Sequence, residues 1–369
     1  MAISEKEFER RYKAIRILME ERGIDCLVVA GRSDYFSRGN IRYLTGLSFG
    51  GYALFPLKGR PVYFLSANQI ASPKHRRAAP VDDILELKEL RNPLEQITKE
   101  IFRFDGGRKI GLVGMNDIQV PMYLLLKEAL GERLVDGDAL FARLRPVKSE
   151  EEIGKMRVAA SIADRVCIML RKTIAPGLSD YEIYGSVKKA IYEMGADYSM
   201  ELIDAEGSTM NMAWGPSGDR LEEKGTLFLE ITPAFDGYYA QLPVTLPVGG
   251  YTAALTRMKE AWAEAMEAAG GFLRPGARVC DLHRSAEEVI RQSGFVSPLP
   301  AGHAIGLDAI DFWRIDESNE TILEAGMTIA FHPCVLLEMG GIGMGMGYTF
   351  LINDTGAENL SGLDLRELT

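Results

Sequence analysis

The chain has 369 residues, of which 47% are hydrophobic and 25% are charged, and this length and composition are typical of a globular protein with two or three domains. Its formal net charge of −10 argues against nucleic acid or an anionic membrane as a partner. The four cysteines form no C-x-x-C pair and no apolar stretch has membrane-spanning length, so we expect a cytoplasmic location.

The first 145 residues predict an α/β domain. Residues 1–23 indicate an amphipathic helix rather than a signal peptide, and residues 25–32 and 108–114 indicate buried strands. The stretch from residue 40 to residue 67, beginning with NIRYLTGL, predicts short strands that Gly and Pro interrupt. Arg38 lies just before this stretch and Arg42 lies within it, and each could face solvent, a carboxylate ligand or a neighbouring subunit.

A second domain is predicted over residues 146–369. Ser149 is the expected N-cap of a long helix, because Glu150, Glu151 and Glu152 follow it in the first turn, where the helix dipole favours acidic residues. Segments 174–198 and 273–295 resemble each other, each with a Pro-Gly turn, a capping Asp, an amphipathic helix and a closing Gly. Two similar halves predict a pseudo-symmetric domain with a cavity where the halves meet.

Residues 225–249 predict a β-hairpin that turns at Asp236-Gly237. This register places Glu230 opposite Pro243, and it brings Glu230 and Gln241 to one face as diagonal neighbours within side-chain reach. A surface hairpin with its polar face in water is the alternative. The many Phe, Leu, Tyr and Val residues favour a buried face, on which a carboxylate without a partner costs several kcal/mol.

An ordered set of motifs runs along essentially the whole chain. The motifs are NIRYLTG (40–46), LRPVKSEEEI (144–153), the two Pro-Gly segments, GPSGDRLEEKG (215–225), DGYY (236–239), AGHAIGL (301–307), LEAGMTIAFHP (323–333) and NDTGAENLS (353–361). In this order and spacing they resemble the creatinase, aminopeptidase P and prolidase family. The resemblance implies a creatinase-like α/β domain over residues 1–145, a pseudo-symmetric pita-bread domain (α/β, or α+β) over residues 146–369, and a homodimer in which Arg38 and Arg42 contact the neighbour's active site.

The peptidases of this family hold two divalent metals with two Asp, one His and two Glu, and this chain keeps few of these residues. In family order the positions carry Glu230 (after a one-residue gap), Gln241, His303, His332, and Gly347 or its neighbour Met346. A dinuclear site needs carboxylates to bridge and neutralise two dications. A true dinuclear Xaa-Pro peptidase is therefore the least favoured function.

Creatinase itself works without metal, so the loss of ligands need not abolish activity. Its proton-shuttle His position carries Trp214 here, and its hairpin acid aligns with Pro243. The creatinase reaction is therefore not supported residue by residue, and the chain combines the family's scaffold with a changed site.

Three hypotheses follow for this site, which the resemblance builds from Glu230, His303 and His332. In the favoured one, His303 and His332 are general acid and base, Glu230 orients an imidazole or binds a cationic nitrogen, and water attacks an amide or amidine C–N bond of a small nitrogenous metabolite. The second is an enzyme with a single divalent metal on Glu230, His303, His332 and Gln241. The third is a non-catalytic binding protein. Only the second hypothesis needs a metal cofactor.

The predicted surroundings of the site are aromatic and apolar. Trp214 and Tyr239 are expected to contact the substrate, with Met344 and Met346 as an apolar floor. The substrate-binding candidates are Gln241, Trp214, Tyr239, Arg38, Arg42 and Met346. After the His303 loop come Asp308, Asp311 and Arg314, which predict a surface salt-bridge cluster.

Overall fold

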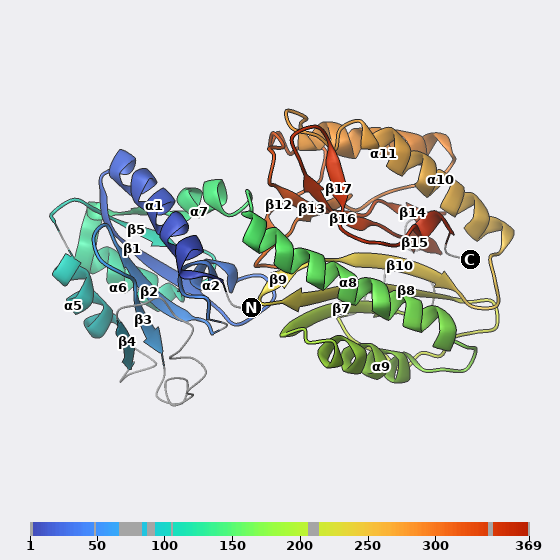
Figure 1. The fold of residues 1–369 in the computed structure, drawn as a ribbon, viewed down its shortest axis with the longest axis horizontal. Helices are drawn as coiled ribbons and strands as arrows, with labels where there is room; N and C mark the ends of the chain where they lie inside the picture. Colours follow the sequence, from blue (N-terminus) through green and yellow to red (C-terminus); the bar gives the residue numbers. More distant parts are fainter. Residues whose placement is uncertain are drawn as a thin grey trace. The chain divides into compact units, whose positions relative to one another are not determined.

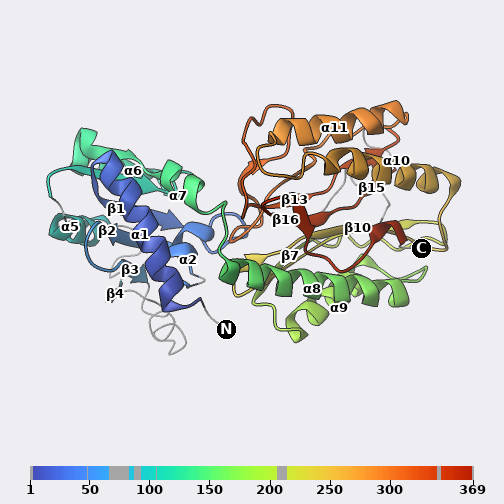
Figure 2. The same cartoon turned by 45° about the horizontal axis from the view of Figure 1, so that its top comes forward.

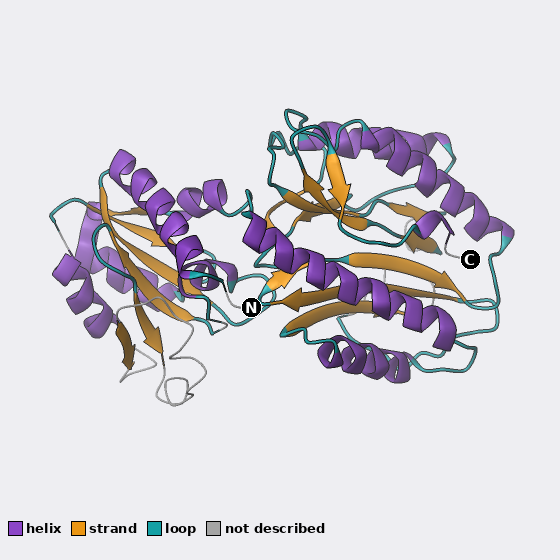
Figure 3. Cartoon of the chain, viewed as in Figure 1, coloured by secondary structure: helices purple, strands orange, loops and turns teal. Residues whose placement is uncertain are grey.

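The computed structural model describes residues 3–47, 49–65, 83–86, 93–104, 106–205, 214–338 and 342–367. The chain divides into two compact units, Met1–Arg145 and Pro146–Thr369 (Figure 1). Each unit has its own sheets and helices, and Figure 3 shows how they alternate along the chain.

The N-terminal unit contains a mixed sheet with the strand order β4-β3-β2-β1-β5-β6, in which β1 is buried along its whole length. The strands are β1 (Ile24–Gly31), β2 (Gly51–Pro56), β3 (Val62–Leu65), β4 (Asp83–Glu86), β5 (Lys109–Val113) and β6 (Leu134–Asp136). The helices are α1 (Glu5–Arg22), α2 (Gly39–Thr45), α5 (Leu94–Phe104), α6 (Val120–Leu130), the 3-10 turn η1 (Gly131–Arg133) and α7 (Asp138–Leu144).

Helix α2 corrects the expectation of a strand at NIRYLTG. Its β-branched and aromatic residues favour a strand, but local contacts favour the helix. Gly46 ends the helix in the left-handed conformation with φ 70°, and the Thr45 hydroxyl donates to the Ile41 carbonyl. A glycine in this conformation satisfies the last carbonyl groups of a helix without steric cost.

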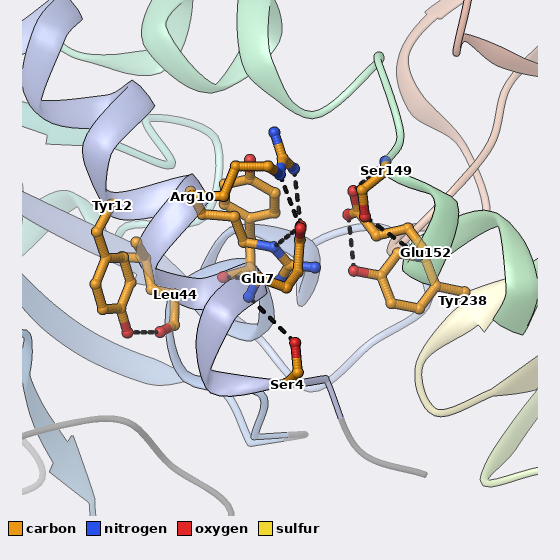
Figure 4. Close-up of polar contacts among 10 residues, drawn as sticks. Ser4, Glu7, Arg10, Tyr12, Leu44, Ser149, Glu152 and Tyr238 are labelled. Atoms are coloured by element: carbon orange, nitrogen blue, oxygen red, sulfur yellow. Dashed lines mark hydrogen bonds and ion pairs between the residues drawn. The ribbon is translucent and has the colours of Figure 1, made fainter.

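Helix α1 is fixed to α2 by buried polar groups. Glu7 accepts hydrogen bonds from Arg10 and Arg11, and the Tyr12 hydroxyl donates to the Leu44 carbonyl at 2.6 Å (Figure 4). The Arg11 guanidinium lies 4.5 Å from the centre of the Tyr43 ring. The buried charge of Arg11 therefore has both a carboxylate and an aromatic face as partners.

The C-terminal unit has two helix pairs with strands between them (Figures 1 and 2). One sheet has the order β10-β8-β7 with β9 paired to β8, a second has the order β12-β11-β13-β16-β17, and β14 pairs with β15. The helices are α8 (Glu150–Thr173), α9 (Asp180–Glu193), α10 (Ala253–Gly270), α11 (Val279–Gln292) and the 3-10 turn η3 (Leu365–Glu367). The strands are β7 (Tyr198–Asp204), β8 (Thr226–Phe235), β9 (Tyr238–Tyr239), β10 (Leu242–Pro247), β11 (Gly302–Ala304), β12 (Asp311–Arg314), β13 (Thr328–Phe331), β14 (Cys334–Leu336), β15 (Gly343–Gly345), β16 (Tyr348–Ile352) and β17 (Ala357–Asn359).

The start of α8 confirms the predicted cap. The Ser149 side chain accepts from the backbone of Glu152, and the Glu152 carboxylate accepts from the backbone of Ser149. The Tyr238 hydroxyl also donates to Glu152 at 2.8 Å, so this capping box ties the helix to the hairpin (Figure 4). At the two similar segments the expected capping Asp is wrong, because Ser179 and Arg278 occupy the N-cap positions.

The predicted hairpin register is confirmed. Asp236 and Gly237 have φ of 47° and 87°, as a two-residue type I′ turn requires, and Pro243 pairs with Glu230. The Lys155 ammonium lies 2.9 Å from the Asp236 carboxylate and so ties the turn to α8.

Candidate active site

A row of paired strand residues connects the two larger sheets of the C-terminal unit. His303 on β11 pairs with Ala330 on β13, and Ala330 pairs with Thr349 on β16. The Thr349 hydroxyl accepts from the Gln241 backbone N–H at 2.8 Å and donates to the Gln241 carbonyl at 3.0 Å. Thr349 therefore attaches the hairpin segment that carries Gln241 to the sheet that carries His303.

Glu230 and Gln241 form the first polar pair of the site. The Gln241 amide Nε2 donates to Glu230 Oε2 at 2.9 Å, and the two residues are only 6% and 3% exposed. Burial raises the pKa of Glu230 to about 7, and the hydrogen bond from Gln241 opposes this shift only in part. Glu230 is therefore a carboxyl group that gains and loses a proton near neutral pH.

His303 and His332 form the second pair, with ring centres 5.3 Å apart and planes at 71°. Burial lowers the pKa of His303 to about 4, and burial together with the neighbouring His303 lowers the pKa of His332 to about 3. Both rings are therefore neutral at neutral pH. His303 Nδ1 lies 3.0 Å from the Ala304 carbonyl, which can only accept, so Nδ1 carries the proton and Nε2 the lone pair.

Gly347 allows the chain at His332, which lies between β13 and β14, to approach closely. A Cβ atom at this position would lie 2.2 Å from the Phe331 carbonyl oxygen and 2.5 Å from both Cα and Cβ of His332. The Gly347 N–H donates to the Pro243 carbonyl at 3.2 Å, and Pro243 is the residue that pairs with Glu230. The chain at His332 is thereby connected, through Gly347 and Pro243, to the strand that carries Glu230.

Cys334 is a residue of this region that the sequence analysis did not select. Its side chain is 4% exposed, its sulfur lies 4.0 Å from the His332 carbonyl, and burial together with the nearby Glu230 raises the thiol pKa to about 12. The thiol is therefore un-ionised at neutral pH. Its position two residues after His332 was the available sequence signal.

The side chains at the family's metal positions do not fit a pair of divalent ions. They supply one carboxylate, one amide and two imidazoles, while Gly347 has no side chain to contribute. Two dications would then face a single negative charge in a buried region. Within the described ranges, no three or more His, Cys, Asp or Glu side chains are grouped so as to hold a metal ion. The single-metal arrangement of Glu230, Gln241, His303 and His332 stays a prediction.

The remaining predicted substrate contacts occupy different environments. Trp214 is 60% exposed, whereas Tyr239 and Met346 are fully buried. The backbone of Tyr239 donates to the Gly306 carbonyl in the loop after His303, and the Met346 carbonyl accepts from the indole of Trp262. Arg38 and Arg42 belong to the N-terminal unit and are 3% and 7% exposed.

The prediction of a surface salt-bridge cluster after His303 is wrong for Asp308 and Asp311, because both are buried. Asp308 and Asp311 are 5% and 1% exposed, and Asp311 Oδ2 lies 3.6 Å from the ammonium of Lys148, which is equally buried. Gly306 leaves room for this ion pair, because a Cβ there would lie 2.5 Å from Asp311 Oδ2. The pair anchors the loop after His303 to the segment before α8, and no local pattern around Lys148 indicated it.

Comparisons with known proteins assign the chain to a family. Residues 154–354 match the model of metallopeptidase family M24, and residues 11–147 match the creatinase/prolidase N-terminal domain. Because the first match covers more than half of the chain, the protein belongs to metallopeptidase family M24. The predicted family is confirmed, and so is the predicted fold, a creatinase-type N-terminal domain followed by a pita-bread domain.

Individual relatives span the whole chain. The protein is 26% identical to ectoine hydrolase of Halomonas elongata, over 98% of this chain and 96% of that protein. It is 24% identical to an Xaa-Pro dipeptidase of Pyrococcus horikoshii, over 97% and 98%. The crystal structure of the prolidase from Pyrococcus horikoshii OT3 matches with a TM-score of 0.83 at 21% identity, over 98% of this chain and 100% of that one. These relatives are hydrolases, and the expectation of an enzyme that hydrolyses a C–N bond agrees with them.

Within the described parts of the chain, no helix is both long and apolar enough to cross a membrane.

Proposed function

We propose that this protein hydrolyses a C–N bond in a small nitrogen-containing metabolite, using Glu230, His303 and His332 and no pair of metal ions. The observation that carries the proposal is Glu230, a buried carboxyl group held by Gln241 at a family metal position, with a pKa of about 7. The full-length relative named ectoine hydrolase supports a substrate other than a peptide.

The pKa values favour a division of roles that differs from the sequence-based hypothesis. A group that first takes and then returns a proton works best when its pKa is near the working pH. Glu230 meets this condition, while imidazoles with a pKa of about 4 and about 3 hold a proton only in acid. Glu230 is therefore the proton carrier, and His303 and His332 accept hydrogen bonds from the attacking water or from the substrate.

The reaction is balanced by one water molecule. Water adds through its oxygen to the carbon of the C–N bond while Glu230 takes one of its protons. Glu230 then returns this proton to the departing nitrogen, the C–N bond breaks, and the nitrogen leaves as an amine while the carbon keeps the oxygen. No oxidant, reductant or phosphate donor takes part.

The test is turnover by protein treated with a chelator, on a panel of small amides, amidines and ureas that includes ectoine, with the dipeptide Gly-Pro for comparison. We expect release of amine from a member of the panel and not from Gly-Pro. We expect Glu230→Gln to lower kcat by about 10²-fold or more, because proton transfer typically contributes 10²–10⁴-fold.

The matched control is Glu358→Gln, which removes a half-exposed carboxylate paired to Arg157 on the surface and should leave kcat unchanged. Full activity of Glu230→Gln would refute the assignment of Glu230. Turnover that disappears with the chelator and returns with one equivalent of metal would instead favour the single-metal arrangement. Absence of turnover on the whole panel, with retained binding of a panel member, would favour a binding protein.

A further inference from the structure

We infer that Thr349 is a positioning residue of the site, because its hydroxyl fixes the backbone of Gln241 and thereby the side-chain amide that meets Glu230. This inference rests on the proposed function and adds to it a residue that touches no reacting atom. A second threonine makes the same contacts elsewhere in the fold, and the comparison of the two separates positioning from mere support.

Two threonine hydroxyls hold the backbone of a residue from another strand segment. Thr349 accepts from the N–H of Gln241 at 2.8 Å and donates to the carbonyl of the same residue at 3.0 Å. Thr245 accepts from the N–H of Gly345 at 3.0 Å and donates to the carbonyl of the same residue at 3.1 Å. A hydroxyl group has one proton and two lone pairs, so each threonine satisfies both backbone groups of its partner.

The two contacts lie at the ends of one antiparallel seam between residues 241–245 and residues 345–349. Pro243 lies two residues before Thr245, and Gly347 lies two residues before Thr349. The Gly347 N–H donates to the Pro243 carbonyl at 3.2 Å in the middle of the seam, and Pro243 has no N–H to return a bond. The threonines are 1% and 2% exposed, so both ends of the seam are buried.

The Thr349 end of the seam lies at the site. Gln241 falls between β9 and β10, where the strand is interrupted, and its side-chain Nε2 donates to Glu230 at 2.9 Å. Thr349 pairs with Ala330, which pairs with His303. Residues paired across neighbouring strands project to the same face, so the Thr349 hydroxyl lies on the face that carries the His303 imidazole.

The two threonines differ in what they hold. Thr349 fixes both backbone groups of Gln241, and so it sets the position from which the amide reaches Glu230. Without the hydroxyl, the N–H and the carbonyl of Gln241 would be buried without partners, and the segment would have to move to satisfy them. Thr245 holds Gly345, which has no side chain to direct. The same contact therefore positions a side chain at one end of the seam and only joins strands at the other.

The first test observes the Gln241 amide directly and needs no turnover. Selective ¹⁵N labelling of glutamine gives a side-chain NMR signal for each glutamine, and Gln241→Met identifies the one that belongs to Gln241. Thr349→Val, which replaces the hydroxyl with a methyl group, should shift this signal and speed the exchange of its protons with solvent about tenfold or more. Thr349→Ser keeps the hydroxyl and should resemble the wild type, and so should the matched control Thr245→Val.

The second test measures kcat on the substrate that the panel of amides, amidines and ureas identifies. Thr349→Val should lower kcat about 10- to 100-fold, because a displacement of about 1 Å in a site can cost that much, while Thr349→Ser and Thr245→Val should stay within about threefold of the wild type. Both valine variants should lower the melting temperature alike, by about 5 °C, because each leaves two buried backbone groups unpaired. Adding Thr349→Val to Gln241→Met should not lower kcat further, because a residue that acts through Gln241 has then lost its target.

An unchanged Gln241 signal in folded Thr349→Val would overturn the inference, and so would equal losses of kcat in Thr349→Val and Thr245→Val. A further drop in kcat when Thr349→Val is added to Gln241→Met would also overturn it. These results leave the proposed hydrolysis standing, because turnover would still depend on Glu230. Absence of turnover by the wild type on the whole panel would refute the proposed function instead, and the Gln241 signal would then decide the positioning by itself. If Thr349→Val does not fold, Thr349→Cys takes its place, because a thiol is a weaker donor and acceptor and should change the same signal in the same direction.

Discussion

Replacing Glu230 with Gln should stabilise the protein at neutral and alkaline pH while it removes activity. Burial raises the pKa of Glu230 from its ordinary value of 4.5 to about 7. In the folded state the carboxyl therefore holds its proton over a pH range in which the unfolded chain has already released it. A carboxyl group of this kind supports folding fully below about pH 4.5, and its contribution is lost as the pH rises through about 7.

The size of the effect follows from the same shift. A difference of about 2.5 in pKa corresponds to about 3 kcal/mol between the charged forms in the folded and unfolded states. A neutral Gln avoids this cost and retains a hydrogen-bond acceptor for Gln241. The variant should therefore match the wild type near pH 4.5 and exceed it by about 3 kcal/mol at pH 8.

The assay is urea-induced unfolding of both proteins at several pH values from 4.5 to 8. Glu7→Gln is the matched control, because Glu7 is a second buried carboxylate but accepts hydrogen bonds from Arg10 and Arg11. Burial raises the pKa of Glu7, but the two arginines outweigh burial and leave the pKa below its ordinary value, so the replacement should lower stability at pH 8. A difference between Glu230→Gln and wild type that is independent of pH, or that has the opposite sign at pH 8, would refute the reasoning.

Three further outcomes are expected. Gly347→Ala should lower the free energy of unfolding by about 1–3 kcal/mol, because the added Cβ overlaps backbone atoms. The control Gly185→Ala, where the added Cβ enters open space on α9, should raise the free energy of unfolding by about 0.5–1 kcal/mol. Equal effects of the two variants in thermal unfolding would contradict this. Protonation of His303 should cost the folded state stability as the pH falls from 6.5 towards 4, because burial lowers the pKa of His303 to about 4, while Glu230 acts in the opposite direction over the same range. His303→Gln should therefore lose less stability than the wild type between these pH values, by up to about 3 kcal/mol in urea titrations, and an unchanged pH dependence would argue against a buried neutral ring. Lys148→Met should lower the free energy of unfolding by about 3–5 kcal/mol, because it removes the ammonium that faces the buried carboxylate of Asp311. A decrease below about 1 kcal/mol in urea titrations would contradict a buried ion pair.

Local rules predicted those parts of the structure that depend on near neighbours in the sequence. The Asp236-Gly237 turn fixes the hairpin register, because both residues must adopt positive φ, and Glu230 faces Pro243 as a direct result. Ser149 caps α8 through contacts within four residues. The same kind of reasoning was wrong at NIRYLTG, where composition favoured a strand and Gly46 closed a helix instead.

The properties of the site depend on contacts between distant segments, and for this reason they could not be predicted from the sequence. The carboxyl of Glu230 titrates near neutrality only because the packed sheets remove it from water. The burial of Asp311 depends on Lys148, which lies in a segment far away in the chain. The edge-to-face arrangement of His303 and His332 likewise arises from the packing of β11 against β13.

The close strand approach at Gly347 has a consequence for engineering. By resemblance this position, or its neighbour Met346, carries the last carboxylate of the metal-binding peptidases, so a Glu at position 347 is one step towards recreating their pair of metal ions. Such a graft would push its first side-chain atom into the main chain of the adjoining strand. A Glu at position 347 therefore requires the neighbouring backbone to be redesigned first.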